Sequence, residues 1–171
     1  MENQVSSKSI ILNYGLYYGV LSILISVIMY ALGQHTEQGV VPMLLGFAIM
    51  IAFIILGIKK VKETNDGLIS WGQSVKTGVG VVVIGVLISI VYQQIFINFI
   101  EPDFMAQMLE KQQQAWLDAG MTEEQIESQM GMMEKMQGPV ISSAIAIVFS
   151  AFLAFVVSAI AGAIMKAEEQ Y

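Results

Sequence analysis

The sequence of this chain predicts an all-α polytopic membrane protein with four transmembrane helices and an extracytoplasmic helical hairpin between the third and the fourth. Of its 171 residues, 56% are apolar and only 13% are charged, whereas a soluble domain carries about 25% charged residues. Aspartate, glutamate, lysine and arginine are absent from four long windows, which are 10–32, 39–58, 77–100 and 140–165. A bilayer core of about 30 Å needs about 20 helical residues, so each window is long enough to span it.

The same windows exclude two other architectures. A transmembrane strand alternates apolar and polar residues, whereas the apolar residues here run continuously. The helices of a soluble bundle carry polar outer faces, which these windows lack. We therefore expect a single membrane domain over residues 1–171, into which residues 101–138 are inserted as the hairpin.

The first window, 10–32, is expected to be retained as a helix and not removed as a signal peptide. Its 23 uncharged residues exceed the about 7–15 apolar residues of a signal-peptide core. Lys8 is the only basic residue before it. Gly15 and Gly19 form the small-xxx-small pattern that lets two membrane helices approach closely, so they are candidate helix-contact residues.

The third helix is expected to begin before its apolar window. Ser70 and Gln73 fit a capping box, in which each side chain binds the backbone N–H of the other residue. Trp71 then lies at the level of the lipid headgroups, where an amphipathic indole is favoured. Pro102 is expected to end this helix.

Polar side chains gather near the end of the third window, at Tyr92, Gln93, Gln94 and Asn98. They can line a polar pocket, or they can form hydrogen bonds between helices, which is the commoner role of such groups in membranes. No window contains the intramembrane charges that usually mark a transport path.

The fourth window carries the clearest helix-contact pattern. Five small residues follow one another at intervals of four, which places them on one helical face: Ala146, Ser150, Ala154, Ser158 and Gly162. Membrane helices pack closely through such small side chains. We therefore expect this stripe to lie against another helix.

The segment 101–138 is expected to form two helices joined near Gly120. Pro102 suits the start of the first helix, and Thr122 with Gln125 fits a second capping box at the start of the second. Each helix has an apolar stripe, and together the stripes form the candidate partner surface: Phe104, Met108, Leu109, Trp116, Ile126, Met130 and Met133.

Charge and methionine set this segment apart from the rest of the chain. It contains eight carboxylates and two lysines, and this balance of −6 equals the net charge of the whole protein. Four methionines lie close together, at positions 130, 132, 133 and 136. Thioethers suit Cu(I), but methionine also gives an adaptable apolar surface, and the second role is the one we expect.

The distribution of lysine predicts the orientation in the membrane. Six of the eight lysines flank one side of the predicted bundle: Lys8, Lys59, Lys60, Lys62, Lys76 and Lys166. Basic flanks resist translocation. We therefore expect both termini in the cytoplasm, with the acidic hairpin outside.

Residues that usually carry chemistry are scarce. The chain has no cysteine, and so neither a thiolate metal site nor a thiol nucleophile. His35 is the only histidine; it has Glu37 nearby but no further ligand or catalytic partner in the sequence, and we expect a solvated loop residue. Arginine is absent and no basic face is clustered, which argues against nucleic-acid binding. We expect no enzyme activity, no cofactor and no metal.

Two short stretches carry a resemblance to a known family. They are GLISWGQS at 67–74 and GMTEEQIE at 120–127. With them, and with its two-span start and acidic loop before the last span, the chain resembles the Bacteroidota membrane proteins grouped as domain of unknown function 4199. The resemblance implies an inner-membrane location in a Gram-negative bacterium and carries no activity, ligand or catalytic residue.

The expected function is therefore a non-enzymatic one. The leading hypothesis is an inner-membrane protein that acts through protein contacts of its outer hairpin, with a membrane or periplasmic protein, or a second copy of the chain, as partner. The alternative is a subunit of a small oligomeric transporter or channel, which would need several copies to enclose a path with so few polar groups.

Overall fold

The computed structural model describes residues 7–36, 39–136 and 138–167, and within these ranges the chain is helical apart from short connections. The elements are α1 (Ser7–Ala31), α2 (Val40–Glu63), α3 (Trp71–Ile95), the π-helix η1 (Phe96–Ile100), α4 (Phe104–Asp118), α5 (Glu123–Met136) and α6 (Pro139–Met165). The prediction of an all-α fold is confirmed.

Four helices are long enough and apolar enough to cross a membrane: α1, α2, α3 together with η1, and α6. Large apolar side chains cover their outer faces, for example Leu24, Leu56 and Phe152, which are all exposed. α2 continues beyond its apolar window to Glu63, and α3 begins before its window at Trp71. Both extensions are polar turns, which a helix tolerates outside the hydrocarbon layer.

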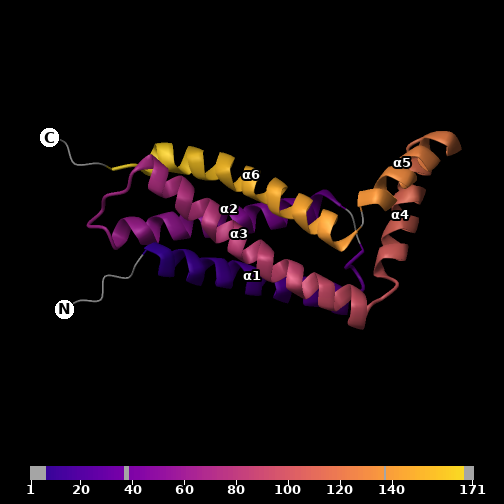
Figure 1. Ribbon diagram of the computed structural model, residues 1–171, viewed down its shortest axis with the longest axis horizontal. Coiled ribbons are helices and arrows are strands. Elements are labelled where there is room, and N and C mark those ends of the chain that lie inside the picture. Colours follow the sequence, from indigo (N-terminus) through magenta and orange to yellow (C-terminus); the bar gives the residue numbers. More distant parts are fainter. Residues whose placement is uncertain (1–6, 37–38, 137, 168–171) are drawn as a thin grey trace.

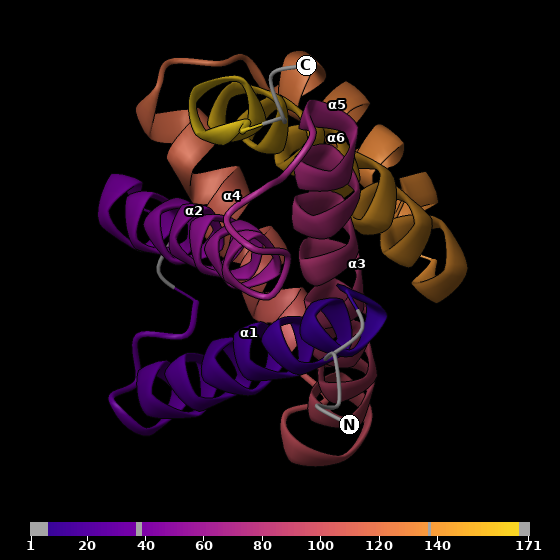
Figure 2. The same cartoon turned by 90° about the vertical axis from the view of Figure 1, so that its left-hand side faces the viewer.

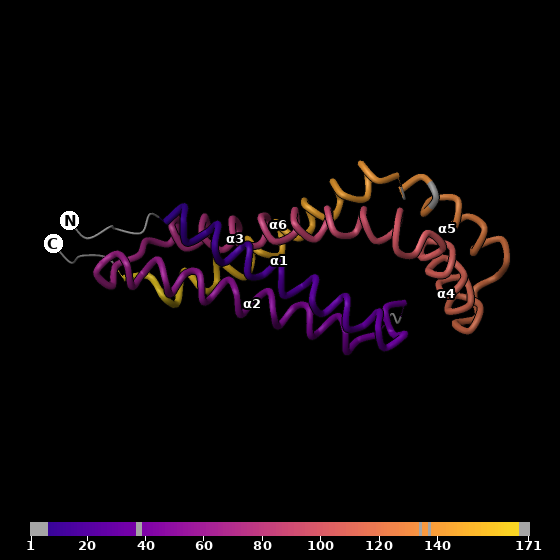
Figure 3. Tube along the Cα trace, turned by 90° about the horizontal axis from the view of Figure 1, so that it is seen from below, coloured from indigo at the N-terminus to yellow at the C-terminus, as the bar shows by residue number. Residues whose placement is uncertain are grey.

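α3 is the central helix of the bundle and packs against α1, α2 and α6 (Figures 1 and 2). The start of α1, the α2–α3 connection and the end of α6 lie at one end, which we call the terminal end. The α1–α2 connection, α4 and α5 lie at the other, the hairpin end (Figure 3).

Glycines allow α1 and α3 to approach closely. Gly15 and Gly19 are buried in this contact. A Cβ atom added at Gly15 would lie 2.6 Å from Ile84 Cβ, and one added at Gly19 would lie 2.9 Å from Ile88 Cβ. Across the contact, a Cβ atom on Gly85 would overlap the ring of Tyr18. A larger side chain at any of these glycines would therefore separate the helices.

The contact between α3 and α6 is equally close. A Cβ atom on Gly78 would overlap the Ser158 hydroxyl, and one on Gly162 would lie 2.8 Å from Ser74 Cβ. Of the predicted α6 stripe, three positions are buried here: Ala154, Ser158 and Gly162. Ser150 is half-buried and Ala146 is exposed, because α6 diverges from α3 towards the hairpin end (Figures 1 and 2).

Buried apolar residues concentrate in the half of the bundle nearest the terminal end. They include Ile10, Met50, Ile54, Ile58, Val61, Ile69, Val82, Ala154 and Ala161. These residues come from all four long helices and from the α2–α3 connection. The buried core therefore lies nearest the terminal end, where six of the eight lysines are found.

Polar contacts fasten the end of α6 to the α2–α3 connection. Ile69 and Ala167 exchange two backbone hydrogen bonds, of 2.8 and 3.0 Å. Lys62 Nζ donates to the Met165 carbonyl at 2.9 Å. Met165 is the last residue of α6, and the negative end of the α6 dipole also stabilises the lysine cation there. The indole of Trp71 donates to the Ala159 carbonyl at 3.0 Å.

Both predicted capping boxes are present. Gln73 N–H donates to Ser70 Oγ at 3.2 Å, and Ser70 N–H donates to Gln73 Oε1 at 2.9 Å. Thr122 and Gln125 form the same reciprocal pair at 3.0 and 3.3 Å. The starts of α3 and α5 are thus set by local sequence, as predicted.

Candidate functional site: the hairpin and its anchor

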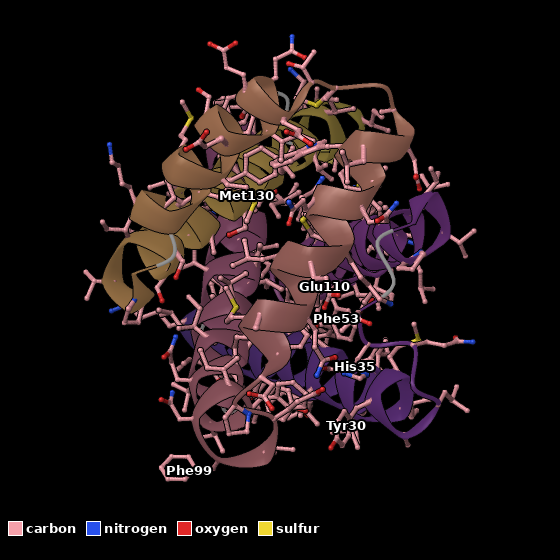
Figure 4. The ribbon with its side chains drawn as sticks, turned by 90° about the vertical axis from the view of Figure 1, so that its right-hand side faces the viewer. Tyr30, His35, Phe53, Phe99, Glu110 and Met130 are labelled. Carbon is pink, nitrogen blue, oxygen red and sulfur yellow. The ribbon has the colours of Figure 1, made fainter. Side chains whose placement is uncertain are left out.

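α4 and α5 form a hairpin that lies across the end of the bundle (Figures 1 and 4). α4 follows the end of α3, α5 leads into the start of α6, and the two helices contact each other. Gly120 in their connection has a φ of +82°, a conformation that glycine adopts without strain and that commonly ends a helix. The predicted stop at Gly120 is therefore where the first hairpin helix ends.

A π-helix joins α3 to the hairpin. Glu101 N–H donates to the Phe96 carbonyl at 2.9 Å, five residues back, and π-turns of this kind are frequent at functional sites. Phe96 is buried at 4% exposure while Phe99, at 81%, points away from the bundle (Figure 4). The π-helix ends at Ile100, and Glu101 follows with a non-helical φ of −139°, consistent with the bias of a residue before proline away from the helical conformation.

Aromatic rings pack around Phe96 at this junction. The Phe96 ring lies edge-on to Tyr30 at 5.2 Å and edge-on to Phe104 at 5.4 Å between centroids. His35 stacks on Phe104 with an interplanar angle of 28°. Edge-on and offset stacked pairs are the favourable arrangements of aromatic rings. These residues, with Glu101, join the α1 end, the α1–α2 connection, η1 and α4; we call Tyr30, His35, Phe96, Glu101 and Phe104 the anchor cluster.

His35 pairs with Glu101 inside the anchor cluster. His35 Nε2 lies 2.7 Å from Glu101 Oε2, and the two side chains are only 14% and 15% exposed. The distance is that of a charge-assisted contact, although the atoms lack hydrogen-bond alignment, and Nδ1 has no partner among the described residues. Gln107 Nε2 donates to the other carboxylate oxygen at 2.9 Å.

The prediction that His35 is a solvated loop residue is therefore wrong. Its partner Glu101 belongs to another connection of the chain, and sequence spacing alone does not bring the two together. Glu37, the neighbour considered in the sequence, lies outside the described residues. The sequence feature that could have indicated this cluster is the presence of aromatic residues at helix ends, with Tyr30 near the end of α1, Phe96 after α3 and Phe104 at the start of α4.

The predicted partner surface is used largely within the protein. Ile126 is buried at 3% exposure. The other six of its residues are half-buried: Phe104, Met108, Leu109, Trp116, Met130 and Met133. The large apolar side chains of α4 and α5 that remain exposed are Leu117, Met132 and Met136. The exposed apolar side chains are thus not the predicted ones, and they are divided between the end of α4, at Leu117, and the second half of α5, at Met132 and Met136.

The same two helices carry exposed carboxylates. Five are exposed on the two helices: Glu110, Asp118, Glu123, Glu124 and Glu127. The hairpin therefore combines a few open thioether and leucine side chains with a strongly acidic exterior.

A family model described as "Protein of unknown function (DUF4199)" matches residues 13–167. The chain belongs to this family. The expectation drawn from residues 67–74 and 120–127 is therefore confirmed at the level of the family. No curated protein and no solved structure matches the chain. The matched range contains the anchor cluster and the whole hairpin, so both are parts of the DUF4199 domain.

The two other candidate groups, the polar residues near the end of α3 and the methionines of α5, do not form a compact site in this DUF4199 domain. Tyr92 packs against Phe96 at 5.9 Å, and Asn98 Nδ2 donates to the Gln94 carbonyl at 2.7 Å, so part of the polar group on α3 is used locally. Met132 and Met136 are exposed, whereas Met130 and Met133 are half-buried. Among the described residues, no cluster of three histidine or acidic side chains is arranged to hold a metal.

Proposed function

We propose that this DUF4199 protein is a non-enzymatic inner-membrane protein of a Gram-negative bacterium, of the Bacteroidota type, that acts through protein contacts of its hairpin outside the cytoplasm. The observation that carries the proposal is the anchor cluster. It attaches the hairpin to a membrane bundle through the buried Phe96 ring and through half-buried His35, Glu101 and Phe104, while acidic and apolar groups of the hairpin stay exposed. A segment held in one orientation can bind a partner without the entropic cost of ordering it first.

The charges support an extracytoplasmic hairpin. Lys59, Lys60 and Lys62 lie near the end of α2, at the terminal end, and Lys76 lies in the first turns of α3. The hairpin end carries the acidic exterior. Because basic flanks stay in the cytoplasm, this arrangement favours cytoplasmic termini.

We expect topology reporters to divide accordingly. A reporter that is active only outside the cytoplasm should be active when fused within the hairpin at Gly120, and inactive when fused after Tyr171. Activity and expression of each fusion are measured in intact cells. The reverse pattern would contradict the orientation and move the proposed partner to the cytoplasm.

The exposed groups indicate the chemistry of the partner. Met132 and Met136 are exposed four residues apart on α5 and so share one helix face; they offer an adaptable apolar contact, since methionine fits surfaces of varied shape. The exposed carboxylates on the same two helices favour a partner that also carries basic groups, which speed association and select the partner. We infer a membrane or periplasmic protein with a small apolar patch bordered by lysine or arginine.

Site-specific photocrosslinking in cells tests this function. A photoreactive residue at position 132 or 136 should give a discrete crosslinked protein. The matched control is position 99, because Phe99 is apolar and exposed at 81% but lies outside the hairpin. With the captured protein purified, Met132→Glu should weaken binding by at least about 1 kcal/mol, about fivefold, as expected for a residue central to an interface. Equal capture from position 99, or no effect of Met132→Glu, would contradict the proposal.

A further inference from the structure

An apolar groove lies between α1 and α2 in the half of the bundle nearest the hairpin. Its volume is about 670 Å³, and it is open along one side. One wall consists of α1 residues such as Ser22, Ile25 and Met29, and the other of α2 residues such as Leu45 and Ile49. A groove of this size is within the range of ligand sites, which cover about 300–1,000 Å³.

The polarity of the groove changes along its length. At the hairpin end it is bordered by Gln34 and by the backbone of Gly39. Towards the middle of the bundle its walls are mostly aliphatic, with Tyr18 and Ser22 as the hydroxyl-bearing side chains; the Ser22 hydroxyl already donates to the Tyr18 carbonyl at 2.8 Å. The occupant should therefore be polar at one end and apolar along its body.

Gly46 keeps the groove open on the α2 side. A Cβ atom added there would meet no atom within 4 Å, in contrast to the glycines at the helix contacts. A glycine within a helix costs about 0.5–1 kcal/mol relative to alanine. Among the described residues, no helix packs against Gly46 to explain this cost, but the absence of a side chain leaves space in the groove.

The length of the groove matches one leaflet of a bilayer. From Tyr18 to Met29, α1 rises about 16 Å at about 1.5 Å per residue. Half of a hydrocarbon core of about 30 Å is about 15 Å. α1 and α2 are both candidate membrane-spanning helices, so in a bilayer the open side of the groove faces hydrocarbon.

We propose that this groove binds one acyl chain of a phospholipid from the leaflet on the hairpin side, with the polar part of the lipid at Gln34 and Gly39. The chain lies along Ile25 and Ile49 and fills the space beside Gly46. A lipid bound in this way is distinct from the lipids that cover the convex apolar faces of the bundle. The proposal does not depend on the partner of the hairpin.

Photolabelling in vesicles tests the site. The full chain is reconstituted in vesicles of phosphatidylethanolamine and phosphatidylglycerol that contain a phospholipid with a diazirine near the end of one acyl chain. We expect adducts to concentrate on the groove walls, at Ile25, Leu45 and Ile49. Phe155 and Val156 on α6, exposed at 45% and 39%, line neither this groove nor the apolar hollow at Val148 and Phe152, and they report contact with ordinary surrounding lipid. Equal labelling of α6 and of the groove would overturn the proposal.

Two variants fill the groove from opposite walls. Gly46→Phe and Ser22→Phe should each abolish the groove adducts and leave labelling of α6 unchanged. Ala48→Phe is the matched control, because Ala48 is exposed on α2 and does not line the groove; it should retain the adducts. If Gly46→Phe does not fold, Ser22→Phe decides the outcome. Persistence of the adducts in a folded groove variant would overturn the proposal.

A second copy of the chain is the competing occupant. A Gly46→Cys variant in the same vesicles should remain monomeric under oxidising conditions if lipid fills the groove. Efficient formation of a disulfide-linked dimer through position 46 would overturn the lipid assignment in favour of a helix of another copy.

Discussion

Replacing Ser158 with leucine is expected to destabilise the protein more than any replacement on the exposed face of α6. Ser158 is fully buried, and its hydroxyl occupies the space that a side chain at Gly78 would need. Leucine has four side-chain heavy atoms where serine has two, and it would place them where α3 and α6 are already in contact. Overpacking of a filled interior costs about 1–3 kcal/mol, and separation of the two helices would add to this. The measurement is thermal unfolding of the purified protein in a mild detergent.

Two further replacements make this prediction specific. Val156→Leu is the control, because Val156 lies on the same helix and is 39% exposed; Val157 is less suitable, since it packs against the buried core. The Ser158 hydroxyl has no hydrogen-bond partner among the described residues, so Ser158→Ala should preserve or raise stability by removing an unsatisfied polar group. Equal unfolding temperatures for the leucine variants at 156 and 158 would contradict the close contact.

Replacing His35 with alanine is expected to release the hairpin from the bundle without unfolding the transmembrane helices. The change removes the partner of the Glu101 carboxylate and a ring that stacks on Phe104. The lost ring contact is worth about 0.5–1.5 kcal/mol, and the lost ion pair adds to this; because 1.4 kcal/mol is tenfold, exchange rates should rise about tenfold. Hydrogen exchange of the α4 amides in lipid nanodiscs measures the effect.

A double-mutant cycle distinguishes the specific His35–Glu101 interaction from a general destabilisation of the hairpin by each replacement. Glu101→Gln should cost much less when His35 is already alanine, because the two residues are in contact. Gln113→Ala, on the exposed surface of α4, is the control and should leave exchange unchanged. Additive effects of the two anchor replacements would show that the pair does not hold the hairpin.

The sequence predicted those parts of the fold that depend on local chemistry. Each of these parts depends only on residues that are close in the sequence. They are the four apolar windows, the capping boxes at Ser70 and Thr122, and the helix end at Gly120, and the structure contains all of them. The small-residue stripe on α6 identified a helix face but not the point at which the helix diverges, so Ala146 was included although it is exposed.

The anchor cluster could not be predicted in the same way. His35 and Glu101 come from different connections, and their contact depends on how α1, α3 and α4 end relative to one another. The π-turn at Phe96 has no clear sequence signal, yet it determines which aromatic ring turns inwards. The groove beside Gly46 was missed for a related reason, because an isolated glycine in an apolar helix is as compatible with a helix contact as with an open space.

The central position of α3 has a consequence for biosynthesis. The buried glycines of α1 meet α3, a segment that the ribosome makes only after α2 is complete. Until α3 is inserted, the Gly15 and Gly19 face of α1 has no partner helix of matching shape. Arrival of α3 supplies it, and α6 then docks on a surface that is already in place. Assembly is therefore committed at the third insertion, and a chain stalled before that step is the form that membrane quality control would encounter.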